Sequence, residues 1–268
     1  MKAAIIGTGS LGEKIYKNIS GSCDEVILTH NRNKKYPDSK KFDFFVDDIR
    51  DIFEGDKMDV VFLTAKIEFE EDSQKLHDAM IRFLDACRGS RVIYISSDGI
   101  FDGEKGEYSE SDIPHPVTLY GKNLKLCEDL VKQHSDNYCI VRPNYLYSVE
   151  RESVDGRIRR IIKDIEEGKK VTRFTDMYKS PMSYDQAAEA IVKLGLSDYV
   201  GTVHVSGERM SVYEFTKEIL ESMGVSINNL IGEAMPEERP DDFLPDTSLD
   251  SSLMKKLTGI EPLDIKES

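Results

Sequence analysis

The hydrophobic residues in the first half of the chain fall into short, unbroken runs that are separated by longer segments of mixed polarity. An apolar run without alternation is typical of a strand that is buried on both faces of a parallel sheet. Between the fourth and fifth runs, residues 70–87 carry apolar positions at helical spacing. The pattern predicts an α/β fold, a doubly wound parallel sheet with helices on both faces. The expected strands are residues 3–6, 25–29, 42–46, 59–64, 91–95 and 138–142.

The second half of the chain carries mainly helix signals. Ser183 is an expected N-cap, and Ser211 with Glu214 three residues later has the pattern of a capping box. These signals predict helices at 154–168, from 183 to 194 and from 211 to about 223, with a strand at 202–206. We expect residues 1–150 to form the core with the catalytic segment. Residues 151–268 should form mostly a small C-terminal substrate-binding lobe, with some elements returning to the core.

The first apolar run leads directly into GTGSLG, residues 7–12, and a helical pattern follows to residue 19. In such a strand, turn and helix unit, glycines let the backbone approach a pyrophosphate, which lies at the positive end of the helix. A plain tight turn is the alternative. The unit predicts a Rossmann-type, dinucleotide-binding fold. Its expected cofactor contacts are Gly7, Gly9, Ser10, Leu11 and Gly12.

The second strand ends in His30, Asn31 and Arg32, where proteins that use NAD commonly place a carboxylate for the ribose hydroxyls. No carboxylate stands at this tip. The Arg32 guanidinium can pair with a 2′-phosphate, so the sequence favours NADP over NAD and makes Asn31 and Arg32 expected cofactor contacts. The alternative is an ordinary solvated basic loop that does not contact the cofactor.

Residues 96–128 are the candidate chemical segment, because two serines end the fifth strand and Tyr120 opens a helical pattern. Reduction of a ketone by hydride transfer needs a proton donor at the carbonyl oxygen, and a tyrosine hydroxyl can serve. A serine hydroxyl at a strand end can stabilise the charge that develops on that oxygen. Tyr120 and Ser97 are therefore the expected catalytic residues.

This segment resembles the dTDP-4-dehydrorhamnose reductases of the extended short-chain dehydrogenase/reductase family, whose corresponding stretch runs roughly STDYVFDG and then YGKSKLAGE. The positions in register are Ser97, Asp98, Phe101, Asp102, Gly103, Tyr108, Pro116, Tyr120, Gly121, Lys122 and Glu128. The resemblance implies an NADPH-dependent reduction of the 4-keto group of a nucleotide-linked deoxysugar. It also implies further cofactor contacts at Asp48, Ile49, Leu63, Thr64, Ala65, Tyr120 and Pro143, and substrate contacts at Ser97, Asp98, Tyr145 and Arg239.

One position departs from the family pattern, in which a lysine follows the tyrosine by four residues. This chain has Leu124 there, and its lysines stand at Lys122 and Lys125. On an ideal helix the fourth residue lies about 40° around from the tyrosine, whereas the second and fifth lie about 160° and 140° away. Two readings follow: a reductase that lacks this lysine, or a noncatalytic NADP-binding subunit resembling the regulatory subunit of methionine adenosyltransferase. An epimerase or dehydratase is a third, less favoured reading.

The composition narrows the remaining choices. A formal net charge of −14 argues against a nucleic-acid surface, because phosphate binding needs clustered lysine and arginine. The four cysteines lack the spacing of a metal site or a disulfide framework, so we expect no metal. We read His204, a lone histidine in a strand, as structural. With no apolar run near 18 residues and no leader pattern, a cytoplasmic protein without membrane contact is expected. A homodimer stays open.

Overall fold

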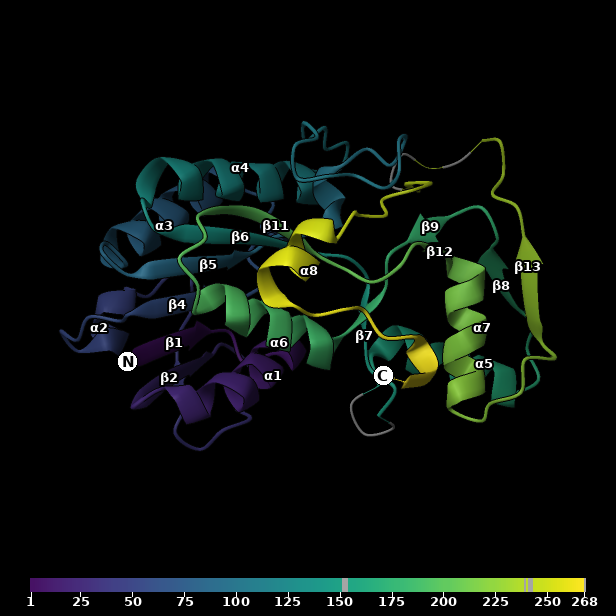
Figure 1. The fold of residues 1–268 in the computed structure, drawn as a ribbon, viewed down its shortest axis with the longest axis horizontal. Helices are drawn as coiled ribbons and strands as arrows, with labels where there is room; N and C mark the ends of the chain where they lie inside the picture. The colour runs from purple at the N-terminus through teal and green to yellow at the C-terminus, as the bar shows by residue number, and fades with distance from the viewer. Residues whose placement is uncertain (151–153, 239, 241–242, 268) are drawn as a thin grey trace.

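The fold is built on a parallel sheet, seen at the left of Figure 1. The computed structural model describes residues 1–150, 154–238, 240 and 243–267. Within these ranges, seven strands pair in parallel in the order β11-β6-β5-β4-β1-β2-β3. The doubly wound α/β fold that the sequence predicts is confirmed. The strands are β1 (Lys2–Ile6), β2 (Glu25–His30), β3 (Lys40–Lys41), β4 (Val60–Leu63), β5 (Arg91–Ile95), β6 (Tyr138–Pro143) and β11 (Gly201–Val205).

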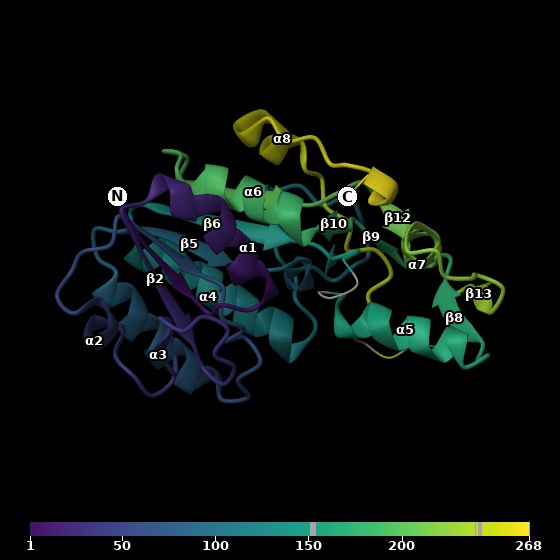
Figure 2. The same cartoon turned by 90° about the horizontal axis from the view of Figure 1, so that it is seen from below.

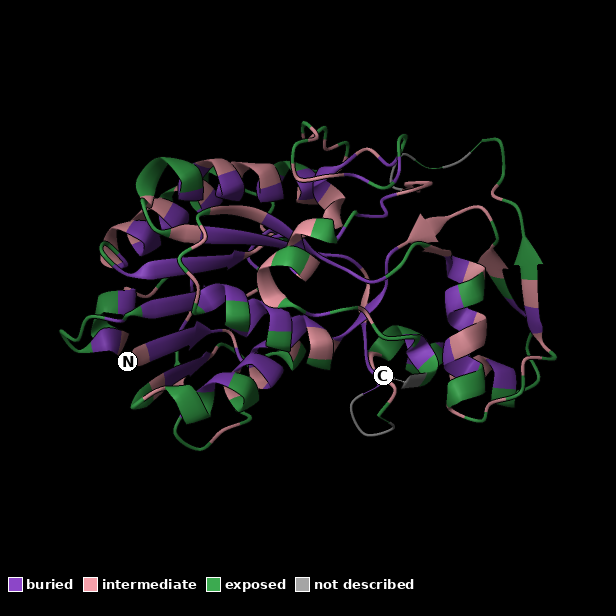
Figure 3. Cartoon of the chain, in the orientation of Figure 1, coloured by how far each residue is buried: buried purple, intermediate pink, exposed green. Residues whose placement is uncertain are grey.

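Helices cover both faces of the sheet (Figure 2). On one face lie α1 (Ser10–Ile19), α6 (Tyr184–Gly195) and α8 (Ser252–Thr258). On the other lie α2 (Ile49–Phe53), α3 (Ser73–Ala86) and α4 (Leu119–His134). Each face has its own cluster of buried apolar side chains, and the central strands are buried along their length (Figure 3). This burial on both sides explains the unbroken apolar runs.

A smaller lobe lies beyond the carboxyl ends of the strands, at the right of Figure 1. Two small apolar clusters join its helices to one another and to short strands. The capping box on Ser211 and Glu214 is formed and starts α7. The lobe and its connections contain β7 (Leu146–Tyr147), α5 (Gly156–Glu166), β8 (Val171–Phe174), β9 (Tyr178–Lys179), β10 (Met182–Ser183), β12 (Met210–Ser211), α7 (Val212–Ser222) and β13 (Leu230–Glu233).

Several elements after residue 150 pack on the sheet. Strand β11 extends the sheet beside β6, and α6 and α8 contribute to the apolar cluster on the α1 face. Two short 3₁₀ turns, η1 (Ser20–Ser22) and η2 (Asp98–Ile100), stand after α1 and β5, and a third, η3 (Ile265–Glu267), ends the described chain. The division at residue 150 stays a prediction.

One expected strand is wrong. Residues 44–46 form a turn, and the third strand is the shorter β3, which ends just before Phe42. The backbone amide of Phe45 donates to Asp43 Oδ1 at 3.0 Å, and the amide of Asp43 donates to Asp47 Oδ2 at 2.7 Å. These aspartates compete with strand pairing for the backbone. The buried Phe44 therefore reaches the core from a turn, which an apolar run alone does not reveal.

Candidate functional site

A cavity of about 1760 Å³ opens at the carboxyl ends of the parallel strands and continues to the lobe. Its walls come from the ends of β1, β2, β4, β5 and β6 and from the start of α5. Ligands of open α/β sheets bind at this edge, since the loops there leave a crevice. Among the expected site residues, the cavity is lined by Gly7, Gly9, Ser10, Leu11, Gly12, Asn31, Arg32, Thr64, Ala65, Ser97, Asp98, Tyr120, Pro143 and Tyr145.

The glycine turn has the geometry of a phosphate cradle. Gly7 has φ +102°, a conformation that favours glycine, and a Cβ at Gly12 would lie 2.3 Å from the Gly7 carbonyl oxygen. Gly9 has open space where a Cβ would stand. Helix α1 begins at Ser10, so its free amides face the cavity beside Gly9. The residues present fit a dinucleotide pyrophosphate.

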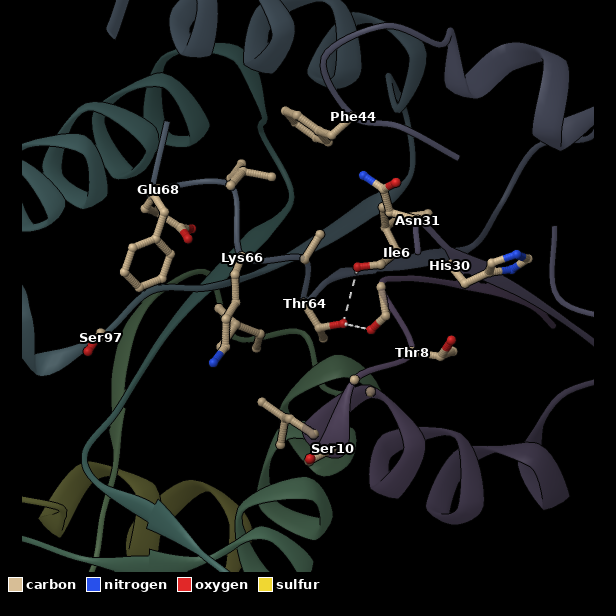
Figure 4. Close-up of a pocket in the computed structure, with 18 of the residues that line it drawn as sticks. Ile6, Thr8, Ser10, His30, Asn31, Phe44, Thr64, Lys66, Glu68 and Ser97 are labelled. Carbon is tan, nitrogen blue, oxygen red and sulfur yellow. Dashed lines mark hydrogen bonds between the residues drawn. The ribbon is translucent and has the colours of Figure 1, made fainter. Parts of the chain in front are cut away.

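The end of β4 is tied to the glycine turn. The Thr64 hydroxyl donates to the carbonyl oxygens of Ile6 and Gly7, at 3.1 and 2.6 Å, as drawn in Figure 4. Lys66, two residues after Thr64, is exposed, and its side chain extends into the cavity between Ser97 and Ser10 (Figure 4). Sequence reasoning missed Lys66, because nothing in its neighbourhood of the sequence marks it as a cavity residue.

Three expected cofactor contacts lie away from the cavity surface. Leu63 is fully buried in the sheet, and Ile49 is 2% exposed in the core. The Asp48 side chain accepts a hydrogen bond from the backbone amide of Arg50 and caps α2. In their place the preceding turn contributes Asp43, Phe44, Phe45 and Val46 to the cavity wall. Arg239 lies outside the described residues.

Tyr120 stands in the first turn of α4, and Thr118 is the N-cap of that helix. The Tyr120 ring stacks on the Phe69 ring, with the two ring centroids 4.8 Å apart. Burial raises the pKa of Tyr120 well above its ordinary value; the nearby Glu68 charge adds to this, and a hydrogen bond with Ser97 opposes it. Tyr120 and Ser97, expected from the sequence as a pair, thus meet at the cavity. Their catalytic role stays a prediction.

The helix brings no lysine to Tyr120. Leu124 is fully buried, Lys122 is exposed, and Lys125 forms an ion pair with Asp129 at 2.6 Å. The helix is regular here, so the angles expected from the sequence apply. Any cation that acts on Tyr120 must therefore come from another element.

A buried acid that sequence reasoning missed lies beside Tyr120. Glu68 is 4% exposed, lines the cavity and accepts a hydrogen bond from the Tyr94 hydroxyl at 2.7 Å. Burial raises the pKa of Glu68 to about 7, although the Tyr94 hydrogen bond opposes the shift. The segment is held in place by Asn123 of α4, whose amide donates to the carbonyl oxygens of Glu68 and Glu70. Only the tertiary structure joins these groups.

A second missed group connects the lobe to the segment after β5. Lys179 of β9 lies 3.5 Å from Asp98 Oδ2 and donates to the Thr247 hydroxyl at 2.5 Å. Thr247 also donates to Asp98 Oδ2, and the Ser97 hydroxyl donates to Asp98 Oδ1 at 2.8 Å. Three segments distant in sequence therefore meet at Asp98.

Tyr145, the other expected substrate contact in the described part of the chain, has an unusual backbone. Its φ is +45°, and its ring lies against Phe215 and under the Arg157 guanidinium, 4.3 Å from the ring centroid. Arg157 in turn pairs with Asp155 at 2.7 Å. Tyr145 is thus fixed at the boundary between core and lobe.

His204 belongs to a buried polar cluster behind the site. Arg142 pairs with Glu128 at 2.7 Å, and the Ser96 hydroxyl donates to the same carboxylate. His204 Nε2 lies 3.3 Å from Arg142, and burial lowers the pKa of this histidine to about 4. Ser96 lines the cavity, whereas Arg142, Glu128 and His204 do not; the cluster fixes β6 against β11 and α4, in agreement with a structural histidine.

Two further observations bear on the kind of site. In the described ranges, no three histidine, cysteine, aspartate or glutamate side chains come together in a way that could hold a metal ion. Among the same residues, no helix has the length and apolar character needed to cross a membrane.

The open parallel sheet, the glycine turn leading into α1 and the cavity at the strand ends define a Rossmann-type α/β protein. Within this class, the family model described as "RmlD substrate binding domain" matches residues 3–267, and the chain belongs to that family. The resemblance to dTDP-4-dehydrorhamnose reductases that the sequence indicates is confirmed.

The similar proteins match most of the length of this chain. A solved structure of a hypothetical dTDP-4-dehydrorhamnose reductase from Sulfolobus tokodaii is 29% identical, with a TM-score of 0.83 over 99% of this chain and 98% of that one. The spore coat polysaccharide biosynthesis protein SpsK of Bacillus subtilis is 26% identical over 84% of this chain and 80% of its own length. Methionine adenosyltransferase 2 subunit beta of Danio rerio is 25% identical over 84% of this chain and 74% of its own length.

Proposed function

We propose that this protein reduces the 4-keto group of a nucleotide-linked deoxysugar with NADPH. The observation that carries the proposal is that one cavity is lined by the glycine turn, by Ser97 and by Tyr120. The similarity to a hypothetical dTDP-4-dehydrorhamnose reductase supports the substrate class. Asp98 and Tyr145 then contact the sugar at the lobe side of the cavity.

Each residue has a definite role in this reaction. A bound reduced nicotinamide supplies the hydride for the carbonyl carbon. Tyr120 donates its proton to the carbonyl oxygen, which gives the alcohol, and the phenolate then takes a proton from water. Ser97 donates a hydrogen bond to the same oxygen. To do so, its hydroxyl rotates away from Asp98, to which it donates in the structure, and toward the ketone.

The preference for NADP rests on the end of β2. His30 ends this strand, and Asn31 and Arg32 follow on the cavity wall without a carboxylate among them. The exposed Arg32 guanidinium can take a 2′-phosphate, whereas the 2′-hydroxyl of NAD would find no acceptor of the usual kind at these three residues.

The Tyr120→Phe variant tests the proton donor. Phenylalanine keeps the ring that stacks on Phe69 but has no proton to give. We expect turnover of dTDP-4-dehydrorhamnose with NADPH to fall at least about a hundredfold, the usual scale of general acid catalysis, while NADPH affinity changes little. The assay follows NADPH oxidation at 340 nm and cofactor binding by fluorescence. Unchanged turnover would remove Tyr120 from the reaction.

A second function is favoured by Leu124 together with the similarity to methionine adenosyltransferase 2 subunit beta. In this case the chain binds NADP in the same cavity and serves as a noncatalytic regulatory subunit. The same two measurements separate the proposals. NADPH binding without reduction of the 4-keto sugar above the Tyr120→Phe level favours the regulatory subunit.

A further inference from the structure

The lysine that α4 lacks raises the question of which cation serves Tyr120. Four lysines line the cavity: Lys35, Lys66, Lys75 and Lys179. Lys35 pairs with Glu13 and Lys75 with Glu70, both at exposed positions. Lys179 differs, because its side chain is only 16% exposed and its partner Asp98 is next to Ser97.

A continuous set of polar contacts leads from Lys179 to Ser97, in the turn against which Tyr120 packs. The ammonium group lies 3.5 Å from Asp98 Oδ2, and Thr247 bridges the two by accepting from Lys179 at 2.5 Å and donating to Asp98. The other Asp98 oxygen accepts from the Ser97 hydroxyl at 2.8 Å. The Tyr120 ring packs against the turn that follows Ser97, where a Cβ at Gly99 would lie 2.9 Å from Tyr120 Cε1, and Ser97 and Tyr120 line the same cavity.

We propose that Lys179 acts on Tyr120 from the lobe, by offsetting the negative charge of Asp98. The inference deepens the reductase function proposed above and makes Lys179 a positioning residue, since it acts through other groups. It takes the part of the missing lysine at position 124, with the charge delivered from β9 instead of from α4.

The charges around Tyr120 give the sign of the effect. Burial is the largest cause that raises the Tyr120 pKa, Glu68 adds to it from the segment after β4, and Asp98 adds to it from the segment after β5. An Asp98 carboxylate without Lys179 would repel the phenolate more strongly. Lys179 therefore makes the Tyr120 hydroxyl a stronger proton donor. By offsetting the charge of Asp98, it also weakens the hydrogen bond between the Asp98 carboxylate and the Ser97 hydroxyl.

The test reads the acidity of residue 120 without any turnover. Tyr120 is replaced by 3,5-difluorotyrosine, which is more acidic than tyrosine, and its ionisation is followed by ¹⁹F NMR in the full-length protein. The Lys179→Met variant should raise the pKa of this residue by about one pH unit, and Asp98→Asn should lower it by a similar amount. The double variant should return close to the parent, because both charges are gone.

Control variants separate charge from structure. Lys179→Arg should leave the pKa near the parent value, and so should Lys193→Met, which breaks an exposed ion pair with Glu189 on the far face of the sheet. The series is repeated with Glu68→Gln, so that titration of this second carboxyl is not counted as an effect of Asp98.

Two results would overturn the inference. One is a pKa of residue 120 that stays unchanged in Lys179→Met, whatever the result for Asp98→Asn; the other is a shift that appears with Lys66→Met instead, which would place the acting cation on the segment after β4. If Lys179→Met does not fold, Lys179→Gln and Asp98→Asn carry the test. Failure of the reductase assay leaves this titration readable, so the two proposals fail separately.

Discussion

At the scale of single residues, the properties of the cavity wall depend on carboxyl groups that are partly or wholly removed from water. Glu68 is the clearest case, since this residue is 4% exposed and its side chain accepts a hydrogen bond from the Tyr94 hydroxyl. A carboxylate in such a place costs free energy relative to the unfolded chain, where it is hydrated.

The Glu68→Gln variant tests this cost. The pKa of Glu68 is raised to about 7, so between pH 5 and 7 the folded protein holds a proton that the unfolded chain has released. Stability therefore falls as the pH rises through this window. Glutamine carries no charge and still accepts from Tyr94. The free energy of unfolding of the Glu68→Gln variant, relative to that of the parent protein, should therefore rise from pH 5 to pH 8 by up to about 3 kcal/mol.

Urea unfolding of both proteins at the two pH values measures this difference. Glu71→Gln, at an exposed position of the same segment, is the matched control and should show little dependence on pH. A difference between Glu68→Gln and the parent that stays the same at pH 5 and pH 8 would contradict a buried, titrating Glu68.

Residues of this kind explain why the site could be predicted only in part from the sequence. Tyr120 and Ser97 stand in a segment whose residue types indicate their chemistry, and the glycine turn follows a buried strand. Glu68 and Lys179 have no such local pattern. They reach the site because the segment after β4 and strand β9 line the same cavity, which only the tertiary structure determines.

At the scale of elements, the unit of β1, the glycine turn and α1 has the most restrictive geometry in the cavity. Gly12 lies so close to the Gly7 carbonyl that an added Cβ would stand 2.3 Å from its oxygen. The backbone there cannot accept a side chain without moving the turn and the start of α1.

The Gly12→Ala variant should therefore weaken NADPH binding at least about tenfold, because the amides that face the pyrophosphate are displaced. Gly21→Ala is the matched control, since a Cβ at Gly21 meets nothing within 4 Å at an exposed position. Fluorescence titration of both variants with NADPH measures the effect. Equal affinity of the Gly12→Ala variant and the parent would mean that the turn does not hold the phosphates.

The elements themselves were largely predictable, for reasons that the exception makes clear. Strands buried on both faces give unbroken apolar runs, and Ser183 and Ser211 cap helices as their side chains allow. Phe42 and Phe44 are buried too, yet Phe42 only follows the end of β3, and Phe44 belongs to a turn in which Asp43 accepts a backbone hydrogen bond. An apolar run that contains or adjoins turn-forming residues such as Asp43 therefore predicts a strand less well than an apolar run without them.

At the scale of the whole molecule, the site is shared between the sheet and the lobe. The cavity runs from the glycine turn to Asp155 and Arg157 at the start of α5, and Lys179 of the lobe contacts Asp98 of the core segment. A substrate placed against Tyr145 would thus touch both parts, while the dinucleotide would contact mainly the strand ends.

This arrangement makes one demand that can be measured directly. If the sugar ketone and the nicotinamide meet beside Tyr120, the hydride must pass from one to the other without exchange with water. Incubation of dTDP-4-dehydrorhamnose with NADPH that carries deuterium at the transferable C4 position should give a product with one deuterium at sugar C4, seen by NMR and mass spectrometry. No reduced sugar, or a reduced sugar without deuterium, would contradict the account.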